Sequence, residues 1–262
     1  MVTGVRGAVT AVVLGLAATG ASAQESRLDA VQKAGALQVC TTGDYKPFTL
    51  AKSDPTTGDG FEGIDIELAK SLAKALGVEA KFVKTKWSDL MADFTAGKCD
   101  VAMGGISVTL ERQKRAFFSA PYLVNGKAPI ARCADKDRFA TVAGIDRPEV
   151  TVIVNPGGTN ERFARASFKN ARIELFPDNV TIFDQILAGK ADVMVAESIE
   201  VKVQEKQHPG LCAINPDEPL QYGEMGYLLP RGDVAFKAFV DQWLHLAKAS
   251  GEFASIYGGF VR

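Results

Sequence analysis

The chain has 262 residues, of which 30 are Lys or Arg and 31 are Asp or Glu, so its formal net charge is −1. A balance this even disfavours the basic surfaces that bind nucleic acid or anionic membranes. The length suits one large domain or two small ones. The two His residues, His208 and His245, have no partner at ligand spacing, so we expect no metal site.

The first 23 residues have the pattern of a secretory signal peptide. Arg6 supplies a positive start, residues 8–18 form an apolar run, and residues 21–23 (Ala-Ser-Ala) fit a cleavage site. The run is shorter than the roughly 20 residues that a membrane span needs. No Cys follows for lipid attachment. We therefore expect cleavage near Ala23 and a soluble protein in the bacterial periplasm.

Helix and strand patterns alternate through the first part of the mature chain. In chain order we expect a helix over 28–34 ended by Gly35, a strand over 36–42, a hairpin tip over 54–60, a helix over 64–76 ended by Gly77, a strand over 80–83, a helical region opened by Trp87 and a short helix from Thr109. Asp44, Tyr45 and Phe48 follow the first strand. Because ligands of open α/β sheets bind beyond the carboxyl ends of strands, this loop is a candidate binding element.

One short phrase occurs twice. Residues 96–101 read Ala-Gly-Lys-Cys-Asp-Val, and residues 188–193 read Ala-Gly-Lys-Ala-Asp-Val. Each copy follows an apolar helical pattern and runs into an apolar strand, and the Gly is placed to end the helix. A helix–turn–strand unit written twice predicts two similar lobes with a cleft between them, where small-molecule sites are favoured.

A second α/β series follows an extended crossing segment over 121–131. In chain order we expect a strand over 150–154, a helix over 161–167 capped by Thr159, strands over 173–176, 191–195 and 211–214, a return segment over 228–230 and a helix over 235–250. The fold class is therefore α/β with two lobes, the second inserted into the first. We expect lobe 1 at 24–126 plus 222–262 and lobe 2 at 127–221.

The four cysteines belong to an exported chain, and an oxidising compartment favours pairing. Cys133 and Cys212 lie near the two ends of the second lobe, and a disulfide between them is one expectation. Cys40 and Cys99 each lie at an apolar strand, where we expect small core residues. Spacing alone leaves the connectivity open.

The Gly-rich segment 155–160 is the sharpest local signal for a ligand. Its backbone N–H groups and the following helix dipole suit a carboxylate or phosphate, and an ordinary strand-to-helix turn is the alternative. The segment lacks the Gly-Lys-Ser/Thr ending of nucleotide loops, so ATP is disfavoured. Arg112 follows another Gly-rich turn, where its guanidinium would hold a carboxylate in a bidentate fork or lie on the surface.

Several segments resemble a known family. The architecture and the doubled phrase resemble the periplasmic solute-binding proteins for polar amino acids, which have the type II periplasmic-binding-protein fold. More specific segments are similar to the periplasmic cyclohexadienyl dehydratases, enzymes built on that fold. These segments are 41–48, 105–107, 110–113, 155–164, 177–183, 199–200 and 241–245.

The resemblance implies a carbon–oxygen lyase that removes water and CO₂ from prephenate, or from arogenate, without a cofactor. Glu200 would be the catalytic general acid, kept protonated in a dry cleft. The resemblance implies that Asp44, Trp87 and Asn155 shape the pocket and that Arg112, Gly158, Thr159 and Asn160 hold a carboxylate. Tyr45 and Phe48, together with Trp87, would form an aromatic wall for a ring or belong to the core. Ser107 and Glu197 complete the expected substrate-binding residues. The partner is then a small dicarboxylate.

The alternative is an amino-acid-binding protein with an ABC permease as its membrane partner. Glu197 stands where the amino-acid-binding relatives are expected to have an Asp that binds the α-amino group. The extra methylene disfavours plain amino-acid binding, and it leaves the choice between prephenate and arogenate open. No interface stripe stands out from the core, so the sequence assigns no oligomeric state.

Overall fold

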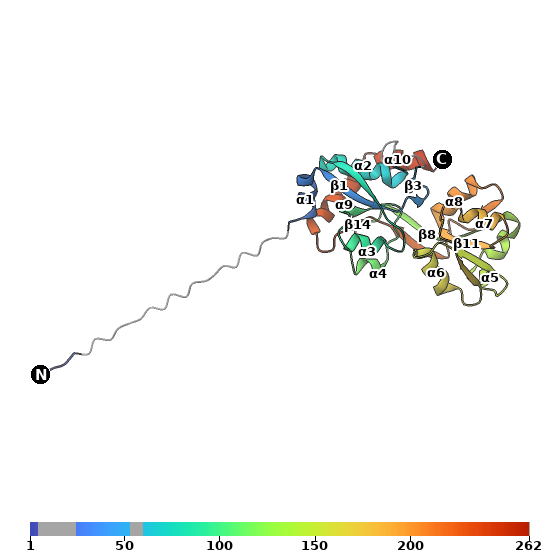
Figure 1. Cartoon of the computed structure of the whole chain (residues 1–262), viewed down its shortest axis with the longest axis horizontal. Coiled ribbons are helices and arrows are strands. Elements are labelled where there is room, and N and C mark those ends of the chain that lie inside the picture. The colour runs from blue at the N-terminus through green and yellow to red at the C-terminus, as the bar shows by residue number, and fades with distance from the viewer. Residues whose placement is uncertain (5–24, 53–59, 262) are drawn as a thin grey trace.

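The computed structural model describes residues 1–4, 25–52 and 60–261 and forms two lobes (Figure 1). Each lobe has its own mixed sheet with helices on its faces, so the two-lobed α/β fold predicted from the sequence is confirmed. Most of the predicted leader, residues 5–23, and most of the predicted hairpin tip, residues 54–59, lie outside the described residues.

The first sheet has the strand order β5-β1-β6-β14-β7. Its strands are β1 (Ala36–Thr41), β5 (Glu79–Lys84), β6 (Val101–Ala102), β7 (Phe117–Phe118) and β14 (Leu228–Leu229). β1 runs parallel to β5 and β6, whereas β14 runs antiparallel to β6 and β7. The helices of this lobe are α1 (Arg27–Ala34), α2 (Ile64–Leu76), α3 (Leu90–Thr95), α4 (Leu110–Gln113), α9 (Val234–Ala249) and α10 (Glu252–Phe260).

The second sheet has the order β10-β9-β11-β8-β12, and β13 also pairs with β8. Its strands are β8 (Leu123–Arg132), β9 (Thr151–Val154), β10 (Arg172–Leu175), β11 (Val193–Glu197), β12 (Leu211–Ala213) and β13 (Gln221–Met225). The predicted crossing segment is the long strand β8, which runs antiparallel to β11, β12 and β13. Its register places Lys127 directly opposite Glu197 of β11.

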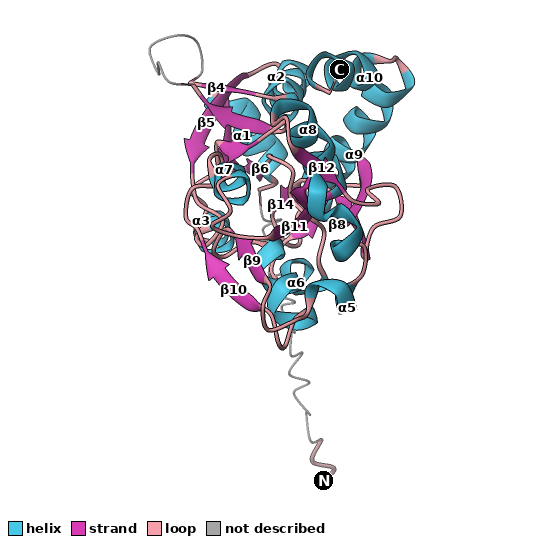
Figure 2. Cartoon of the chain, turned by 90° about the vertical axis from the view of Figure 1, so that its right-hand side faces the viewer, coloured by secondary structure: helices cyan, strands magenta, loops and turns pink. Residues whose placement is uncertain are grey.

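The second lobe contains five helices among the described residues. They are a 3₁₀ helix (Cys133–Phe139), α5 (Val142–Ile145), α6 (Thr159–Ser167), α7 (Ile182–Leu187) and α8 (Ser198–Gln207). Figure 2, which faces this lobe, shows α5 and α6 at one end of the molecule and α2 and α10 at the other. A small antiparallel sheet completes the fold, with strands β2 (Asp44–Tyr45), β3 (Thr49–Ala51) and β4 (Phe61–Glu62).

The repeated phrase forms the same turn in both lobes. It joins α3 to β6 in the first lobe and α7 to β11 in the second. Gly97 and Gly189 leave the two helices with φ of 74° and 71°. This left-handed conformation carries no steric cost for glycine, which explains why both copies contain Gly at that position.

The Asp of each copy fastens the turn to the neighbouring strand. The Gln38 N–H of β1 donates to Asp100 Oδ2 at 2.7 Å, and the Thr151 N–H of β9 donates to Asp192 Oδ2 at 2.8 Å. Charge-assisted bonds of this kind are stronger than neutral ones. In both lobes the Gly of the repeated phrase therefore ends the helix, and the Asp three residues later binds the neighbouring strand.

The cysteines form two disulfides, Cys40–Cys99 and Cys133–Cys212. The prediction that Cys40 and Cys99 are unpaired core residues was wrong. Cys40 lies in β1 and Cys99 just before β6, and the pairing of these strands brings the two Cα atoms to 5.6 Å. That separation is within the range that a disulfide spans.

Other elements also differ from the sequence prediction. Gly158 is the N-cap of α6, and the Thr159 side chain does not cap the helix because its hydroxyl faces Glu197 and Lys127. α3 begins at Leu90, three residues after Trp87. Strand β13 and helix α10 were not predicted, and α10 packs its apolar side chains on the main core of the first lobe.

Candidate active site between the lobes

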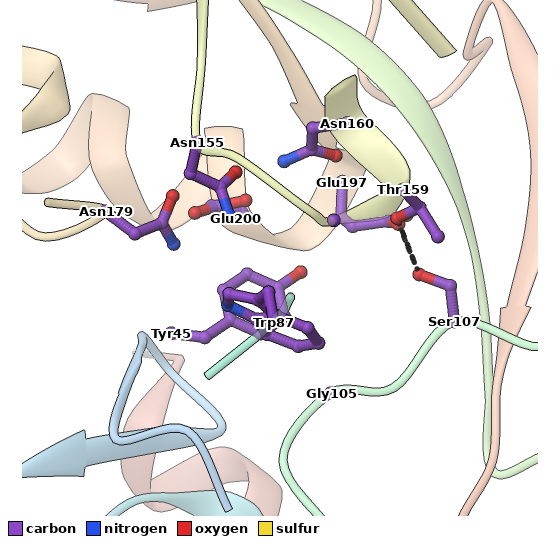
Figure 3. Close-up of a pocket in the computed structure, with 11 residues that line it drawn as sticks. Tyr45, Trp87, Gly105, Ser107, Asn155, Thr159, Asn160, Asn179, Glu197 and Glu200 are labelled. Carbon is purple, nitrogen blue, oxygen red and sulfur yellow. Dashed lines mark hydrogen bonds between the residues drawn. The ribbon is translucent and has the colours of Figure 1, made fainter. Parts of the chain in front are cut away.

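A cavity lies between the lobes and is lined by residues that follow strands of both sheets (Figure 3). Its volume is about 20 Å³, well below the roughly 300–1,000 Å³ of small-molecule sites, so a ligand needs the lobes to part. The first lobe contributes Tyr45, Trp87, Gly105 and Ser107 to its lining. The second lobe contributes Asn155, Gly158, Thr159, Asn160, Asn179, Glu197 and Glu200.

Glu200 lies in the first turn of α8 and is only 1% exposed. Burial, followed by the nearby charge of Glu197, raises the pKa of Glu200 to about 8, while Lys127 and Asn179 oppose the rise. A carboxyl group in this environment is protonated at neutral pH and is able to act as an acid.

Buried polar atoms without a protein partner surround Glu200. Within the described part of the chain, Glu200 Oε2, Asn155 Oδ1, Asn179 Oδ1 and the Tyr45 hydroxyl have no hydrogen-bond partner. Figure 3 shows these side chains converging on the same space. Because a buried unpaired polar group costs about 1–3 kcal/mol, such a cluster indicates a surface shaped for a polar ligand.

Two aromatic rings form the wall contributed by the first lobe. Trp87 meets Tyr45 edge-on, with ring centroids 5.7 Å apart. Gly105 packs so closely on Tyr45 that a Cβ atom there would lie 2.4 Å from Tyr45 Cε1. Phe48 is fully buried behind Tyr45, at a ring distance of 5.3 Å, and does not line the cavity.

Asp44 also lies outside the cavity lining, and it holds residues that do form the lining. Its Oδ1 accepts a hydrogen bond of 3.1 Å from Trp87 Nε1, and its carbonyl accepts one of 3.1 Å from Asn179 Nδ2. Burial raises the pKa of the Asp44 carboxyl above its usual value. The bond to Asn179 also joins the two lobes.

A buried ion pair closes the opposite end of the cavity. Lys127 Nζ lies 2.6 Å from Glu197 Oε1, and the two side chains are 5% and 6% exposed. The ammonium also donates to Thr159 Oγ1 at 2.9 Å and to Asn160 Oδ1 at 2.6 Å. Ser107 of the first lobe donates to Glu197 Oε1 at 2.7 Å, so this cluster is a second bridge between the lobes.

The segment from Asn155 to Asn160 approaches the cavity as the sequence predicts. Helix α6 begins there, so its first N–H groups lack intrahelical acceptors and its positive dipole end lies at the cavity. The Gly157 N–H donates to Glu161 Oε2 at 2.7 Å, which holds the turn. This arrangement suits a carboxylate ligand.

Arg112 is buried but does not reach the cavity lining. Its Nη1 donates to the carbonyl of Ser107 at 2.8 Å, and its side chain lines a neighbouring cavity together with Arg115 and Arg162. Burial, followed by the charge of Arg162, lowers the pKa of Arg112 to about 10. It remains a cation at neutral pH, directly behind the Ser107 backbone.

The sequence analysis missed three contributors to the site, Gly105, Lys127 and Asn179. Gly105 lies in the Gly-rich turn before Arg112, and both Gly105 and Asn179 lie in segments that resemble the family, but neither residue was assigned a role. Lys127 had a usable signal, because it is a charged residue inside the apolar run of the crossing strand. Charged residues are rarely buried unless they are paired, so such a position predicts a buried partner.

Among the described residues, no group of three or more His, Cys, Asp or Glu side chains is arranged to hold a metal ion. In the same ranges of the chain, no helix is both long enough and apolar enough to cross a membrane.

A two-lobed α/β fold with its site between the lobes defines a type II binding-protein architecture. The chain belongs to the bacterial extracellular solute-binding proteins, family 3, whose family model matches residues 37–261. It is 53% identical to a cyclohexadienyl dehydratase of Pseudomonas aeruginosa, over 90% of this chain and 86% of that protein. It is 26% identical to an L-cystine-binding protein of Escherichia coli, over 80% of this chain and 77% of that protein.

Solved structures give the same two kinds of relative. An ancestral amino acid-binding protein described as a precursor of cyclohexadienyl dehydratase matches with a TM-score of 0.82 and 31% identity, covering 90% of this chain and 100% of that one. An ancestral cyclohexadienyl dehydratase matches with a TM-score of 0.57 and 47% identity, covering 91% and 98% of the two chains. Proteins named as amino-acid binders and proteins named as dehydratases are therefore both similar to this chain.

Proposed function

We propose that this chain is a cyclohexadienyl dehydratase, a carbon–oxygen lyase that converts prephenate to phenylpyruvate and arogenate to phenylalanine. The observation that carries the proposal is Glu200, a buried carboxyl with a pKa of about 8 and an unpaired oxygen, which lines the cavity between the lobes. A transport protein that only binds its ligand has no need of a protonated acid there. The 53% identity to the Pseudomonas aeruginosa enzyme supports the same function.

Glu200 acts as the general acid. It donates its proton to the ring hydroxyl of the substrate, the C–O bond breaks and water leaves. The bond from the ring to its carboxylate breaks at the same time, CO₂ leaves, and the bonding electron pair completes the aromatic ring. Glu200 remains as a carboxylate and recovers a proton from solvent. A positioned acid contributes typically about 10²–10⁴-fold to the rate.

The N-terminal turn of α6 binds a substrate carboxylate through its backbone N–H groups. Arg112 donates a hydrogen bond to the carbonyl of Ser107, which lines the cavity, and its positive charge adds positive potential near the carboxylate. Tyr45 and Trp87 form the wall for the ring, while Asn155 and Asn179 orient polar substituents beside Glu200. The substrate's own negative charge raises the pKa of Glu200 further, because like charges disfavour ionisation.

The location and the domain limits are part of the same proposal. The protein is exported to the periplasm after cleavage near Ala23, in keeping with the extracellular family to which it belongs. Lobe 1 comprises residues 24–126 and 222–262, and lobe 2 comprises residues 127–221. Strands β8 and β13 span the two junctions between these segments.

Incubation of the purified protein with prephenate, followed by absorbance of phenylpyruvate in alkali, tests the function. We expect rapid product from the wild type and a loss of about 10²–10⁴-fold in Glu200→Gln. Glu205→Gln, an exposed position on the same helix, is the matched control and keeps wild-type activity. Absence of product from the wild type, together with tight binding of one amino acid, would instead establish a transport protein.

A further inference from the structure

The ammonium of Lys127 lies behind one end of the cavity with its hydrogen-bonding capacity filled. Its three N–H donors are directed to Glu197 Oε1, Asn160 Oδ1 and Thr159 Oγ1, at 2.6, 2.6 and 2.9 Å. The cross-strand register of β8 and β11 places Lys127 opposite Glu197, so the backbone dictates the pair. The ammonium is therefore a fixed part of the site.

Glu197 lines the cavity, whereas Lys127 lies behind that lining. The negative charge of Glu197, which faces a ligand at this end, is therefore already balanced by the ammonium of Lys127. Glu200, the other acid in the lining, is held protonated by burial and by the charge of Glu197. The cavity consequently offers a ligand no free anion.

We infer that Lys127 sets the substrate preference of this site by disfavouring an ammonium group beside Glu197, so that the keto acid prephenate is favoured over its amino counterpart arogenate. The inference rests on the proposed function. Arogenate differs from prephenate in carrying an ammonium where prephenate has a ketone oxygen. A buried ammonium needs an anionic partner, and here it would compete with Lys127 for Glu197 and meet a like charge.

A ketone oxygen has no such requirement. It needs only hydrogen-bond donors, which the N-terminal turn of α6 and the nearby asparagine amides are able to supply. Lys127 thus already pairs with the carboxylate that the ammonium of an amino-acid ligand would need. Specificity arises here through a repulsive element rather than through an added attraction.

Lys127→Met tests the inference, because it removes the charge and retains a chain of similar length. We expect the ratio of kcat/KM for prephenate to that for arogenate to fall about tenfold. We also expect L-phenylalanine and L-arginine, used as probes, to raise the Tm of this variant and not that of the wild type. Lys127→Arg keeps the cation and should keep the wild-type ratio. An unchanged ratio in Lys127→Met, with no effect of either amino acid, would overturn the inference.

Two further variants serve as a control and as a replacement if Lys127→Met does not fold. Lys202→Met removes an exposed lysine that pairs with Asp217 at the surface, and it should leave both readouts unchanged. Lys127→Met leaves a buried charge on Glu197, so Lys127→Gln, whose amide N–H groups are able to donate to that carboxylate, serves if the methionine variant does not fold. In Lys127→Gln the ratio should still fall, and a wild-type ratio there would contradict the inference.

The thermal readout also separates this inference from the proposed function. If the wild type converts neither prephenate nor arogenate, the proposed dehydratase activity is wrong. Stabilisation of Lys127→Met by amino acids would then still establish the role of Lys127 in disfavouring ammonium groups. If the wild type is active and Lys127→Met behaves like it in both readouts, only the inference fails.

Discussion

Trp87 Nε1 donates a hydrogen bond of 3.1 Å to Asp44 Oδ1, although only Trp87 lines the cavity. An acid outside the site therefore sets the orientation of a ring inside it. The same Asp44 is also one of the charges that raise the pKa of Glu200. Orientation and acidity in this site are thus linked through one side chain.

The first prediction concerns the pH dependence of the wild type. A general acid is active while protonated, so kcat/KM for prephenate should be constant below the pKa of Glu200 and fall above about pH 8. A glutamate with the ordinary pKa of 4.5 would place the fall close to that pH. Initial rates between pH 5 and 10 measure this profile. If Glu200 is the catalytic acid, kcat/KM should decline on the alkaline side, and a profile without that decline would contradict the assignment.

The second prediction separates the two effects of Asp44. Asp44→Asn keeps an oxygen acceptor for Trp87 but removes the charge, so the alkaline fall should move to lower pH while the plateau is retained. Asp44→Ala removes the acceptor as well, and its plateau should also drop, by about tenfold, the effect of ~1.4 kcal/mol. The pH profiles of both variants check this. Identical profiles for wild type and Asp44→Asn would show that the charge has no effect on Glu200.

The third prediction is that Glu200→Gln stabilises the protein while it removes activity. The folded-state pKa of about 8 exceeds the ordinary glutamate pKa of 4.5, so the folded state holds a proton that the unfolded state releases. Wild-type stability must therefore fall as pH rises from about 4.5 to about 8, and the cost is fully present above that range. The glutamine variant avoids the cost, which is on the order of a few kcal/mol.

Thermal melts at several pH values measure this effect. The gain in Tm of Glu200→Gln should be small at pH 4 and should grow until about pH 8. The control Glu205→Gln, at an exposed site, should stay within about 0.5 kcal/mol of the wild type at every pH. A gain in Tm that is the same at pH 4 and pH 9 would contradict the burial of an ionisable group.

The fourth prediction concerns the contact between the lobes at Gly157. This glycine has φ of 82°, and a Cβ atom there would lie 2.6 Å from Ser88 Cα of the other lobe. Gly157→Ala should therefore hinder the approach of the lobes and raise KM for prephenate about tenfold. Gly189→Ala is the matched control, because it has a similar φ of 71° but no atom within 4 Å.

Both alanine variants should lose stability to a similar degree, roughly 1–2 kcal/mol, because both place a side chain in the left-handed region. Only Gly157→Ala should change KM. Kinetics together with small-angle scattering with and without substrate provide the readouts. Equal KM values for the two variants would mean that the Gly157 contact does not govern closure.

Most of the fold could be predicted because its signals are local. Helix α2 was predicted at its observed limits, since its apolar side chains recur at helical spacing and Gly77 ends it. Strand β13 has no comparable signal, because its residues Gln-Tyr-Gly-Glu-Met do not alternate. It is a strand because β8 supplies its hydrogen bonds, which is a tertiary effect.

The site was predictable where a local motif or the family resemblance marked its residues. Asn155 belongs to the Gly-rich segment, Glu200 and Trp87 were implied by the resemblance, and all three line the cavity. Lys127 could not be assigned its role, because that role depends on register with a residue 70 positions away. Arg112 follows the predicted turn, but the direction of its guanidinium depends on the path of the Ser107 backbone.

The burial of Glu200 has a consequence for how the molecule works over time. Each conversion consumes the proton of this acid, and a side chain that is 1% exposed cannot recover one while the lobes remain together. Release of product and recharging of the acid thus require the same event, the parting of the lobes. In a transport protein, the opening of the lobes lets the ligand enter. Here the same opening would also return a proton to Glu200, so that the enzyme completes one turnover in each cycle of closing and opening.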